Sequence, residues 1–264
     1  MFDVREIALV TGSGRGIGLG IARALAGAGL KVILADLDIA SARESAAELG
    51  PDALALELDV SKSAGWVSAI EAIRARYGRL DVLVNNAGIS PRGTPETTDE
   101  ELWDRTMGIN LKGAWLGIKA ALPLLKATRG TVINIGSTRA TRPLPGLFAY
   151  GTSKAGLLGL TRQMAAEYLA EGVTCNMVAP GWVDTPGERI LQRSHGVANF
   201  PEGLQNLITT DEVGAAVAYL ISPLARKING IILYLDAGLH VADDAGMVYL
   251  PGISHGRYTQ TGMD

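Results

Sequence analysis

Cysteine is nearly absent from this chain, which has only Cys175 among its 264 residues. A single cysteine cannot form an intrachain disulfide, and it leaves no set of thiolates for a zinc site. No uninterrupted apolar run approaches ~18 residues, the length that a membrane-spanning helix needs. The first residues also lack the basic segment followed by an apolar segment that marks a secretory signal. These absences favour a cytoplasmic protein.

An excess of positive charge is lacking as well. Lys and Arg number 24 against 27 Asp and Glu, which gives a net charge of −3. Nucleic acids and anionic membranes attract positively charged surfaces, so we expect neither as a partner. Apolar residues make up 47% and charged residues 19% of the chain. This composition supplies a large hydrophobic core and excludes general disorder.

Short runs rich in β-branched residues alternate with longer amphipathic segments. We expect strands at 6–11, 31–36, 53–58, 80–84, 130–136, 173–178 and 231–235. We expect helices at 17–28, 39–49, 63–77, 99–126, 150–171 and 211–222. Several strand candidates are apolar on both faces, which is typical of a parallel sheet covered by helices on both sides. The alternation therefore predicts a Rossmann-type, doubly wound parallel sheet of seven strands in an α/β fold.

No linker or internal repeat interrupts this alternation, so residues 1–264 are predicted to form a single domain. Two segments fall outside the pattern. Residues 184–209 are rich in Pro and Gly and follow a strand, beyond whose carboxyl end ligands bind in such sheets, so they are a candidate lid. Residues 239–264 form a C-terminal tail whose apolar residues we expect to pack at a subunit interface.

A glycine-rich turn joins the first predicted strand to the first predicted helix. Its glycines allow the backbone to approach a pyrophosphate, whose charge is attracted by the N–H groups and dipole of the helix N-terminus. The spacing matches neither G-x-G-x-x-G nor a phosphate-binding P-loop, so an ordinary strand–helix turn is the alternative. The candidate cofactor residues here are Gly12, Ser13, Gly14, Arg15, Gly16, Ile17 and Gly18.

Asp36 ends the second predicted strand, 18 residues after Gly18. A carboxylate at this place can accept hydrogen bonds from the adenosine ribose and repels a 2′-phosphate. The guanidinium of Arg15 has the opposite preference, because it can pair with that phosphate. Asp36 acts directly on the ribose, so we predict NAD as the cofactor.

Several further motifs follow in a fixed order: Asp59-Val60, Asn85-Asn86-Ala87-Gly88, Asn110, Ser137, Tyr150-x-x-x-Lys154 and Pro180-Gly181. With the turn at 11–18, this series resembles the short-chain dehydrogenase/reductase family over residues 5–238. The resemblance implies hydride transfer between a secondary alcohol or ketone and a nicotinamide. It also implies a homotetramer, with a homodimer as the second possibility, in which the helices at 99–126 and 150–171 pair across a subunit interface.

Oxidation of an alcohol needs a base, and the ordinary pKa of a tyrosine, ~10, is too high without a nearby cation. Lys154 lies four residues after Tyr150 and shares its helix face. By resemblance, Tyr150 is the general acid/base, and Lys154 lowers its pKa and holds the nicotinamide ribose. Ser137 would orient the substrate, and Asn110 would hold a water that relays protons. Taken singly, each residue has an ordinary structural explanation, such as a strand-end cap or a surface pair.

The other cofactor contacts are also implied by resemblance. Asp59 and Val60 would bracket the adenine. The nicotinamide and its phosphates would contact Pro180, Gly181, Val183 and Thr185. The remaining residues of the cofactor site are Asn86, Ala87 and Gly88, together with Tyr150 and Lys154.

Three arginines are candidates for binding substrate: Arg92, Arg139 and Arg142. Arg139 is the second residue after Ser137, and a guanidinium can hold a carboxylate through two hydrogen bonds. We therefore predict a small hydroxy acid or a sugar acid of the 2-keto-3-deoxy type, with a neutral sugar or polyol as the alternative. His195 is a further substrate candidate. The histidines do not have the spacing of metal ligands, so no metal is expected.

Other classes of protein fit less well. Residues 151–155 approach the G-x-S-x-G motif of a serine hydrolase but lack its final glycine. A nucleotide-sugar epimerase would have a longer C-terminal substrate domain. A regulatory protein that senses the cofactor without turnover is the alternative of a different class. Such a protein would not need the Tyr150–Lys154 pair.

Overall fold

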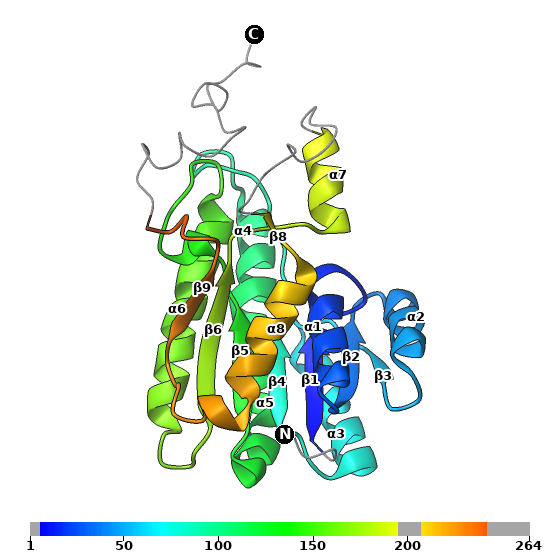
Figure 1. Cartoon of the computed structure of the whole chain (residues 1–264). Helices are drawn as coiled ribbons and strands as arrows, with labels where there is room; N and C mark the ends of the chain where they lie inside the picture. Colours follow the sequence, from blue (N-terminus) through cyan, green and yellow to red (C-terminus); the bar gives the residue numbers. More distant parts are fainter. Residues whose placement is uncertain (1–5, 195–206, 242–264) are drawn as a thin grey trace.

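The structure, a computed structural model, describes residues 6–194 and 207–241 (Figure 1). Seven parallel strands form one sheet in the order β3-β2-β1-β4-β5-β6-β9. The strands are β1 (Ile7–Thr11), β2 (Lys31–Asp36), β3 (Leu54–Glu57), β4 (Val82–Asn85), β5 (Thr131–Ile135), β6 (Thr174–Pro180) and β9 (Ile232–Leu235). The predicted doubly wound sheet is confirmed.

Helices cover both faces of this sheet. One face carries α1 (Gly16–Gly27), α2 (Ile39–Leu49) and α8 (Thr210–Ile221), and the other carries α3 (Ser63–Tyr77), α5 (Gly113–Thr128) and α6 (Phe148–Glu167). Successive residues of β1 enter opposite cores: Ala8 and Val10 pack with α1, and Ile7 and Leu9 pack with α3. This alternation is the pleat of a strand. It explains why the strand sequences are apolar throughout.

The helix expected at 99–126 is present, but a π-helical turn interrupts its regular geometry. The chain forms α4 (Glu100–Met107), one π-helical turn (Gly108–Lys112) and then α5. Inside the π turn the side chain of Asn110 forms hydrogen bonds with the backbone of Ile89, which lies in the connection after β4. Wide turns of this kind commonly occur at functional sites. The tertiary contact of Asn110 therefore decides the geometry of a segment whose local sequence favours one continuous helix.

The segment predicted as a lid is partly helical. Its first part forms α7 (Pro186–Ser194), and a short parallel pair, β7 (Trp182–Val183) with β8 (Leu207–Ile208), brackets the segment. Residues 195–206, with His195, and the tail beyond residue 241 lie outside the described residues. After β8, Thr209 and Glu212 form a reciprocal capping box at the start of α8. None of the helices in the described ranges is long and apolar enough to span a bilayer.

Candidate active site

The glycine-rich turn adopts a backbone that favours glycine at two positions. Gly12 has φ of +61° and Gly16 has φ of +57°, values that side-chain-bearing residues rarely adopt. Helix α1 begins at Gly16, and no side-chain hydrogen bond caps its N-terminus at Arg15. The first N–H groups of a helix lack partners within the helix. The turn therefore presents uncapped donors and the positive end of the helix dipole, which suit a phosphate.

The residues that follow β4 hold the glycine-rich turn in place. Asn86 donates from Nδ2 to the carbonyl oxygens of Thr11 and Gly12, at 2.8 and 2.9 Å. The hydroxyl of Thr11 in turn accepts the N–H groups of Asn86 and Ala87. The amide of Asn86 is thus bonded to the turn itself. The structure places this predicted cofactor residue where it shapes the loop.

Asp36 contacts the same turn from the end of β2. Its carboxylate accepts the N–H of Gly14 at 2.9 Å through Oδ2 and the N–H of Asp38 at 3.0 Å through Oδ1. Arg15 is exposed, and its charge contributes to a lowered pKa of Asp38, whose largest cause is the hydrogen bond from the Ser41 hydroxyl. Two carboxylates therefore lie beside the turn, close to the predicted adenosine position.

The predicted adenine residues follow β3. Asp59 accepts the N–H and the hydroxyl of Ser61 at 2.9 and 2.7 Å. Val60 is buried, and its carbonyl accepts the indole N–H of Trp66 at 3.0 Å. A Cβ added at Gly113 would lie 3.1 Å from the Val60 side chain. Val60 therefore packs against the start of α5, and Asp59 closes a tight turn beside it.

Three separated segments bring the four predicted catalytic residues together. Ser137 follows β5, Tyr150 and Lys154 lie one turn apart on α6, and Asn110 lies in the π turn. The Lys154 ammonium lies 5.7 Å from the centre of the Tyr150 ring and donates to the carbonyl of Ile135 at 2.8 Å. Ser137 and Tyr150 share a hydrogen bond. The four side chains thus face one region at the carboxyl ends of β4 and β5.

The protein surroundings shift the pKa of both members of the Tyr–Lys pair. Burial raises the pKa of Tyr150, the hydrogen bond with Ser137 and the charge of Arg139 lower it, and the charge of Glu188 raises it. Burial lowers the pKa of Lys154 to about 8. The sequence predicted that Lys154 would depress the phenol pKa, but burial is the largest influence. The cation that acts on the phenol here is Arg139.

Asn110 is buried and fully hydrogen-bonded. Its Oδ1 accepts the N–H of Ile89 at 2.8 Å, and its Nδ2 donates to the Ile89 carbonyl and to the hydroxyl of Ser153. Ser153 in turn donates to the Tyr150 carbonyl at 2.7 Å. The sequence reasoning missed this role of Ser153. Its position three residues after Tyr150, on the same helix face, is the available signal.

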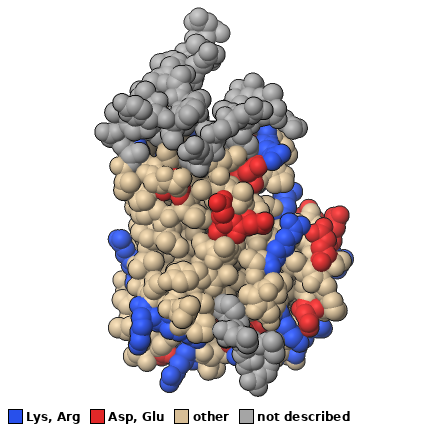
Figure 2. Space-filling view, in the orientation of Figure 1, with Lys and Arg blue, Asp and Glu red and all other residues tan. Residues whose placement is uncertain are grey.

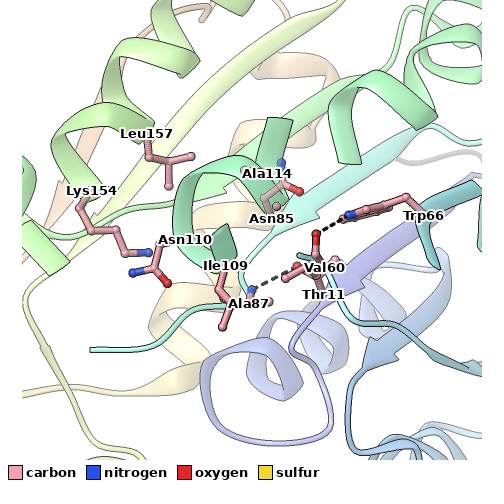
Figure 3. A pocket seen from close by; sticks show the side chains of 11 residues that line it. Thr11, Val60, Trp66, Asn85, Ala87, Ile109, Asn110, Ala114, Lys154 and Leu157 are labelled. Atoms are coloured by element: carbon pink, nitrogen blue, oxygen red, sulfur yellow. Dashed lines mark hydrogen bonds between the residues drawn. The ribbon is translucent and has the colours of Figure 1, made fainter. Parts of the chain in front are cut away.

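A small cavity lies behind these residues (Figure 3), with about 10 Å³ open to the centre of a water molecule. Lys154 and Asn110 lie together on one side, with their polar ends toward each other. Asn85 also lines the cavity: its Nδ2 donates to Asn134 on β5 at 2.8 Å, while its buried Oδ1 has no partner. A cavity of this size, with both polar and apolar side chains in its walls, is at the lower limit for one ordered water.

The strand end at Pro180 and Gly181 approaches the last strand closely. A Cβ added at Gly181 would lie 2.8 Å from that of Asp236. Val183 is buried, and the Thr185 hydroxyl accepts the N–H of Glu188 at the start of α7. Thr185 also lies beside the glycine turn, 3.8 Å from where a Gly16 Cβ would stand. The predicted nicotinamide residues and the predicted phosphate turn thus adjoin.

Glu188 is a residue that the sequence reasoning missed. It lies on α7, accepts the indole N–H of Trp182 at 2.7 Å and acts electrostatically on Tyr150. No local motif marks it, because it is distant from Tyr150 in the sequence and acts on it only in the folded chain.

The three arginines have different surroundings. Arg139 is half-buried, and its charge acts on Tyr150. Arg142 donates to the Leu239 carbonyl, so it joins two parts of the chain. Arg92 is exposed. Among the described residues no cluster of three His, Cys, Asp or Glu side chains could hold a metal ion.

These features fit a nicotinamide dinucleotide. The turn offers uncapped N–H donors, and the carboxylate of Asp36 is bonded to it through the Gly14 N–H. Gly88 keeps a side chain away from the catalytic residues: a Cβ there would lie 3.2 Å from Oδ1 of Asn110 and 3.6 Å from Nζ of Lys154. A glycine-rich turn that suits a phosphate, in a parallel sheet that also carries a Tyr–Lys pair, is typical of a nicotinamide-dependent oxidoreductase. A family model described as enoyl-(acyl carrier protein) reductase matches residues 12–240. The chain belongs to the short-chain dehydrogenase/reductase family.

Individual relatives support this assignment. Trans-4-hydroxycyclohexanecarboxylate dehydrogenase of Sinomonas cyclohexanicum is 36% identical, over 88% of this chain and 92% of the relative. The 3-oxoacyl-[acyl-carrier-protein] reductase of Escherichia coli is 37% identical, over 89% and 98%. A crystal structure of 3-ketoacyl-(acyl-carrier-protein) reductase from Brucella melitensis with NADH has a TM-score of 0.81 at 32% identity, over 88% and 97%. The protein is thus an oxidoreductase that acts on hydroxyl or keto groups with a nicotinamide cofactor.

Proposed function

We propose that this protein interconverts a small hydroxy acid or sugar acid, of the 2-keto-3-deoxy type, and its keto form with NAD as cofactor. The observation that carries the proposal is the half-buried guanidinium of Arg139 near the phenol of Tyr150. A cation beside the reacting position can hold the carboxylate of a substrate. The name of one relative, a hydroxycyclohexanecarboxylate dehydrogenase, describes an alcohol that carries such a carboxylate.

In the proposed reaction Tyr150 accepts the proton of the substrate hydroxyl, and the bound nicotinamide supplies the hydride acceptor. Ser137 holds the reacting oxygen by a hydrogen bond, which fixes its distance from Tyr150. The charge of Arg139 and the hydrogen bond with Ser137 favour the phenolate against the effect of burial. Asn110, bonded to Ile89 and Ser153, keeps the segment beside Lys154 in position. Lys154 would hold the nicotinamide ribose.

The preference for NAD rests on Asp36. A 2′-phosphate beside Asp36 and Asp38 would meet two like charges, whereas ribose hydroxyls can donate to the lone pairs of Asp36 that its two backbone N–H donors leave open. The related structure from Brucella melitensis contains NADH. The other proposed contacts are those of the turn at 12–18, Asp59 and Val60, Asn86 to Gly88, and Pro180 to Thr185.

The test is a panel of sugar acids, hydroxy acids and neutral polyols assayed at 340 nm with NAD and NADP. We expect turnover of acids with NAD. In Arg139→Gln the KM for acids should rise about 10- to 100-fold, which is the change expected when one charged hydrogen bond to the substrate is lost. Arg162→Gln is the matched control, because Arg162 is an exposed arginine of α6 without a predicted role in the site. An unchanged KM for acids in Arg139→Gln would overturn the carboxylate proposal.

A neutral sugar or polyol is the second candidate, and Glu188 favours it. The carboxylate of Glu188 is close enough to raise the pKa of Tyr150. It would therefore repel an acidic substrate but could accept hydrogen bonds from a sugar hydroxyl. Turnover confined to neutral polyols, and lost in Glu188→Gln, would establish this candidate in place of the first.

We also propose a homo-oligomer, a tetramer or else a dimer, in which α5 and α6 meet their copies. Trp115 on α5 is 45% exposed and Leu169, just past α6, is 69% exposed. Figure 2 shows a second face, around β9 and α8, whose middle carries few charged side chains. Two different self-complementary faces are what a tetramer needs. Light scattering of the wild type and of Trp115→Glu tests this proposal: the variant should dissociate to a smaller assembly.

A further inference from the structure

The chain beyond β9 folds around a buried carboxylate. Asp236 is 2% exposed. It accepts the N–H groups of Gly238 at 3.1 Å and His240 at 2.7 Å, and it lies 2.9 Å from Nδ1 of the His240 ring. A carboxylate only accepts hydrogen bonds, so Nδ1 carries the proton and donates it. His240 therefore donates hydrogen bonds to the Asp236 carboxylate from both its backbone N–H and its ring, and a buried charge needs such partners.

The same turn is joined to the loop that follows β5. The His240 ring stacks on the Tyr234 ring, with centres 3.8 Å apart and planes 8° from parallel. The Tyr234 hydroxyl shares a hydrogen bond of 2.7 Å with the hydroxyl of Thr141. The carbonyl of Leu239, the residue before His240, accepts a hydrogen bond from the Arg142 guanidinium. Two contacts thus connect residues 234–240 with residues 141–142.

Residues 137–142 form the segment that carries Ser137 and Arg139. Within it the N–H of Arg139 donates to the Ser137 hydroxyl at 3.2 Å, and the N–H of Arg142 donates to the Thr138 carbonyl at 2.9 Å. The Arg139 guanidinium donates to the Arg142 carbonyl at 3.4 Å. The position of Arg142 therefore affects where the side chain of Arg139 lies.

We propose that His240 is a positioning residue for the substrate site. By its bond to Asp236 and its stacking on Tyr234 it fixes the turn at 236–240, and that turn holds residues 137–142 through Thr141 and Arg142. His240 contacts no reacting group in this arrangement. It acts through the loop, and its effect on substrate binding rests on the proposed function of Arg139.

Two variants separate the two contacts of His240. His240→Phe keeps a ring to stack on Tyr234 but removes the donor to Asp236. His240→Asn keeps an N–H donor near the Nδ1 position but removes the ring. Val241→Ala, at an exposed neighbour, is the control. Hydrogen exchange of the backbone amides of Arg139, Ala140, Thr141 and Arg142 reports on the loop without any substrate.

In His240→Phe we expect these four amides to exchange about tenfold faster, while the amides of β1 keep the wild-type rate. His240→Asn should restore most of the protection, and Val241→Ala should match the wild type. If the loop amides of His240→Phe exchange as in the wild type, or if β1 and the loop change equally, the positioning role is wrong.

Kinetics then distinguish this inference from the proposed function. We expect the KM for acidic substrates to rise about tenfold in His240→Phe, since small displacements of a binding group are costly, with kcat and the NADH dissociation constant within twofold of the wild type. Faster loop exchange with an unchanged KM for acids would support the positioning role and overturn the carboxylate proposal. An equal loss of NADH affinity would overturn the positioning role.

Discussion

The ammonium of Lys154 lies over the ring of Tyr150, 5.7 Å from its centre, and donates to the carbonyl of Ile135. Helix α6 sets the spacing of the two residues, one turn apart, and the end of β5 supplies the carbonyl. Because the lysine is only 5% exposed, its charge lacks water, and burial lowers its pKa to about 8. The pair is therefore formed by the junction of a strand end and a helix.

The pKa of Lys154 predicts a pH-dependent stability. The folded protein holds this proton less tightly than the unfolded chain, whose lysine has the ordinary pKa of 10.5. The contribution of Lys154 to the free energy of unfolding is thus fully present above pH 10.5 and is lost as the pH falls through about 8. Between pH 8 and pH 10 the wild type should gain about 2 kcal/mol relative to Lys154→Met, at about 1.4 kcal/mol per unit. Urea unfolding at several pH values measures the difference, and a constant difference would contradict the burial of a charged lysine.

Removal of the Tyr150 hydroxyl should abolish most turnover. In Tyr150→Phe we expect kcat to fall about 10³-fold, because general acid/base catalysis contributes 10² to 10⁴. NADH binding, followed by fluorescence, should change far less, since the ring remains. Tyr219→Phe, an exposed tyrosine on α8, is the control. Wild-type rates in Tyr150→Phe would require a different base.

Replacement of Asp36 should weaken the preference for NAD. In Asp36→Ser the charge near the proposed 2′ position is lost, so the ratio of kcat/KM for NAD to that for NADP should fall by about tenfold or more. Steady-state kinetics with both cofactors measure this ratio. Asp52→Ser is the control, because Asp52 forms only a surface ion pair with Lys31. A wild-type enzyme that prefers NADP would overturn the assignment of Asp36.

Substitution by alanine at two glycines of α1 should have opposite effects on the stability of the protein. A Cβ at Gly18 would lie 2.2 Å from the carbonyl oxygen of Gly12, which is backbone and cannot move easily. We expect Gly18→Ala to lose about 2 kcal/mol or more of unfolding free energy. A Cβ at Gly27 would meet nothing within 4 Å, so Gly27→Ala should gain about 0.5 kcal/mol through the unfolded chain. Urea unfolding of both variants tests the contrast.

Much of the architecture could be predicted from the sequence, because it depends on local patterns. The apolar runs of β1 and β2 and the helical segments between them determine a parallel sheet with helices on both faces. The motifs around Tyr150 and Lys154 indicated the family, which the comparisons establish. The predicted ends of most strands and helices lie within a few residues of those observed, since burial patterns and caps are also local.

Other features depend on residues that meet only in the folded chain. The side chain of Asn110 forms hydrogen bonds with the backbone of Ile89, 21 residues away, and a π-helical turn interrupts the α-helix at this contact. The charges that act on Tyr150 come from Arg139, which follows β5, and from Glu188 on α7. Thr141 and Tyr234, 93 residues apart, form one hydrogen bond. The hydrophobic pattern determined the sheet by itself, but the electrostatic surroundings of Tyr150 were decided by tertiary packing, because burial and charge act through space.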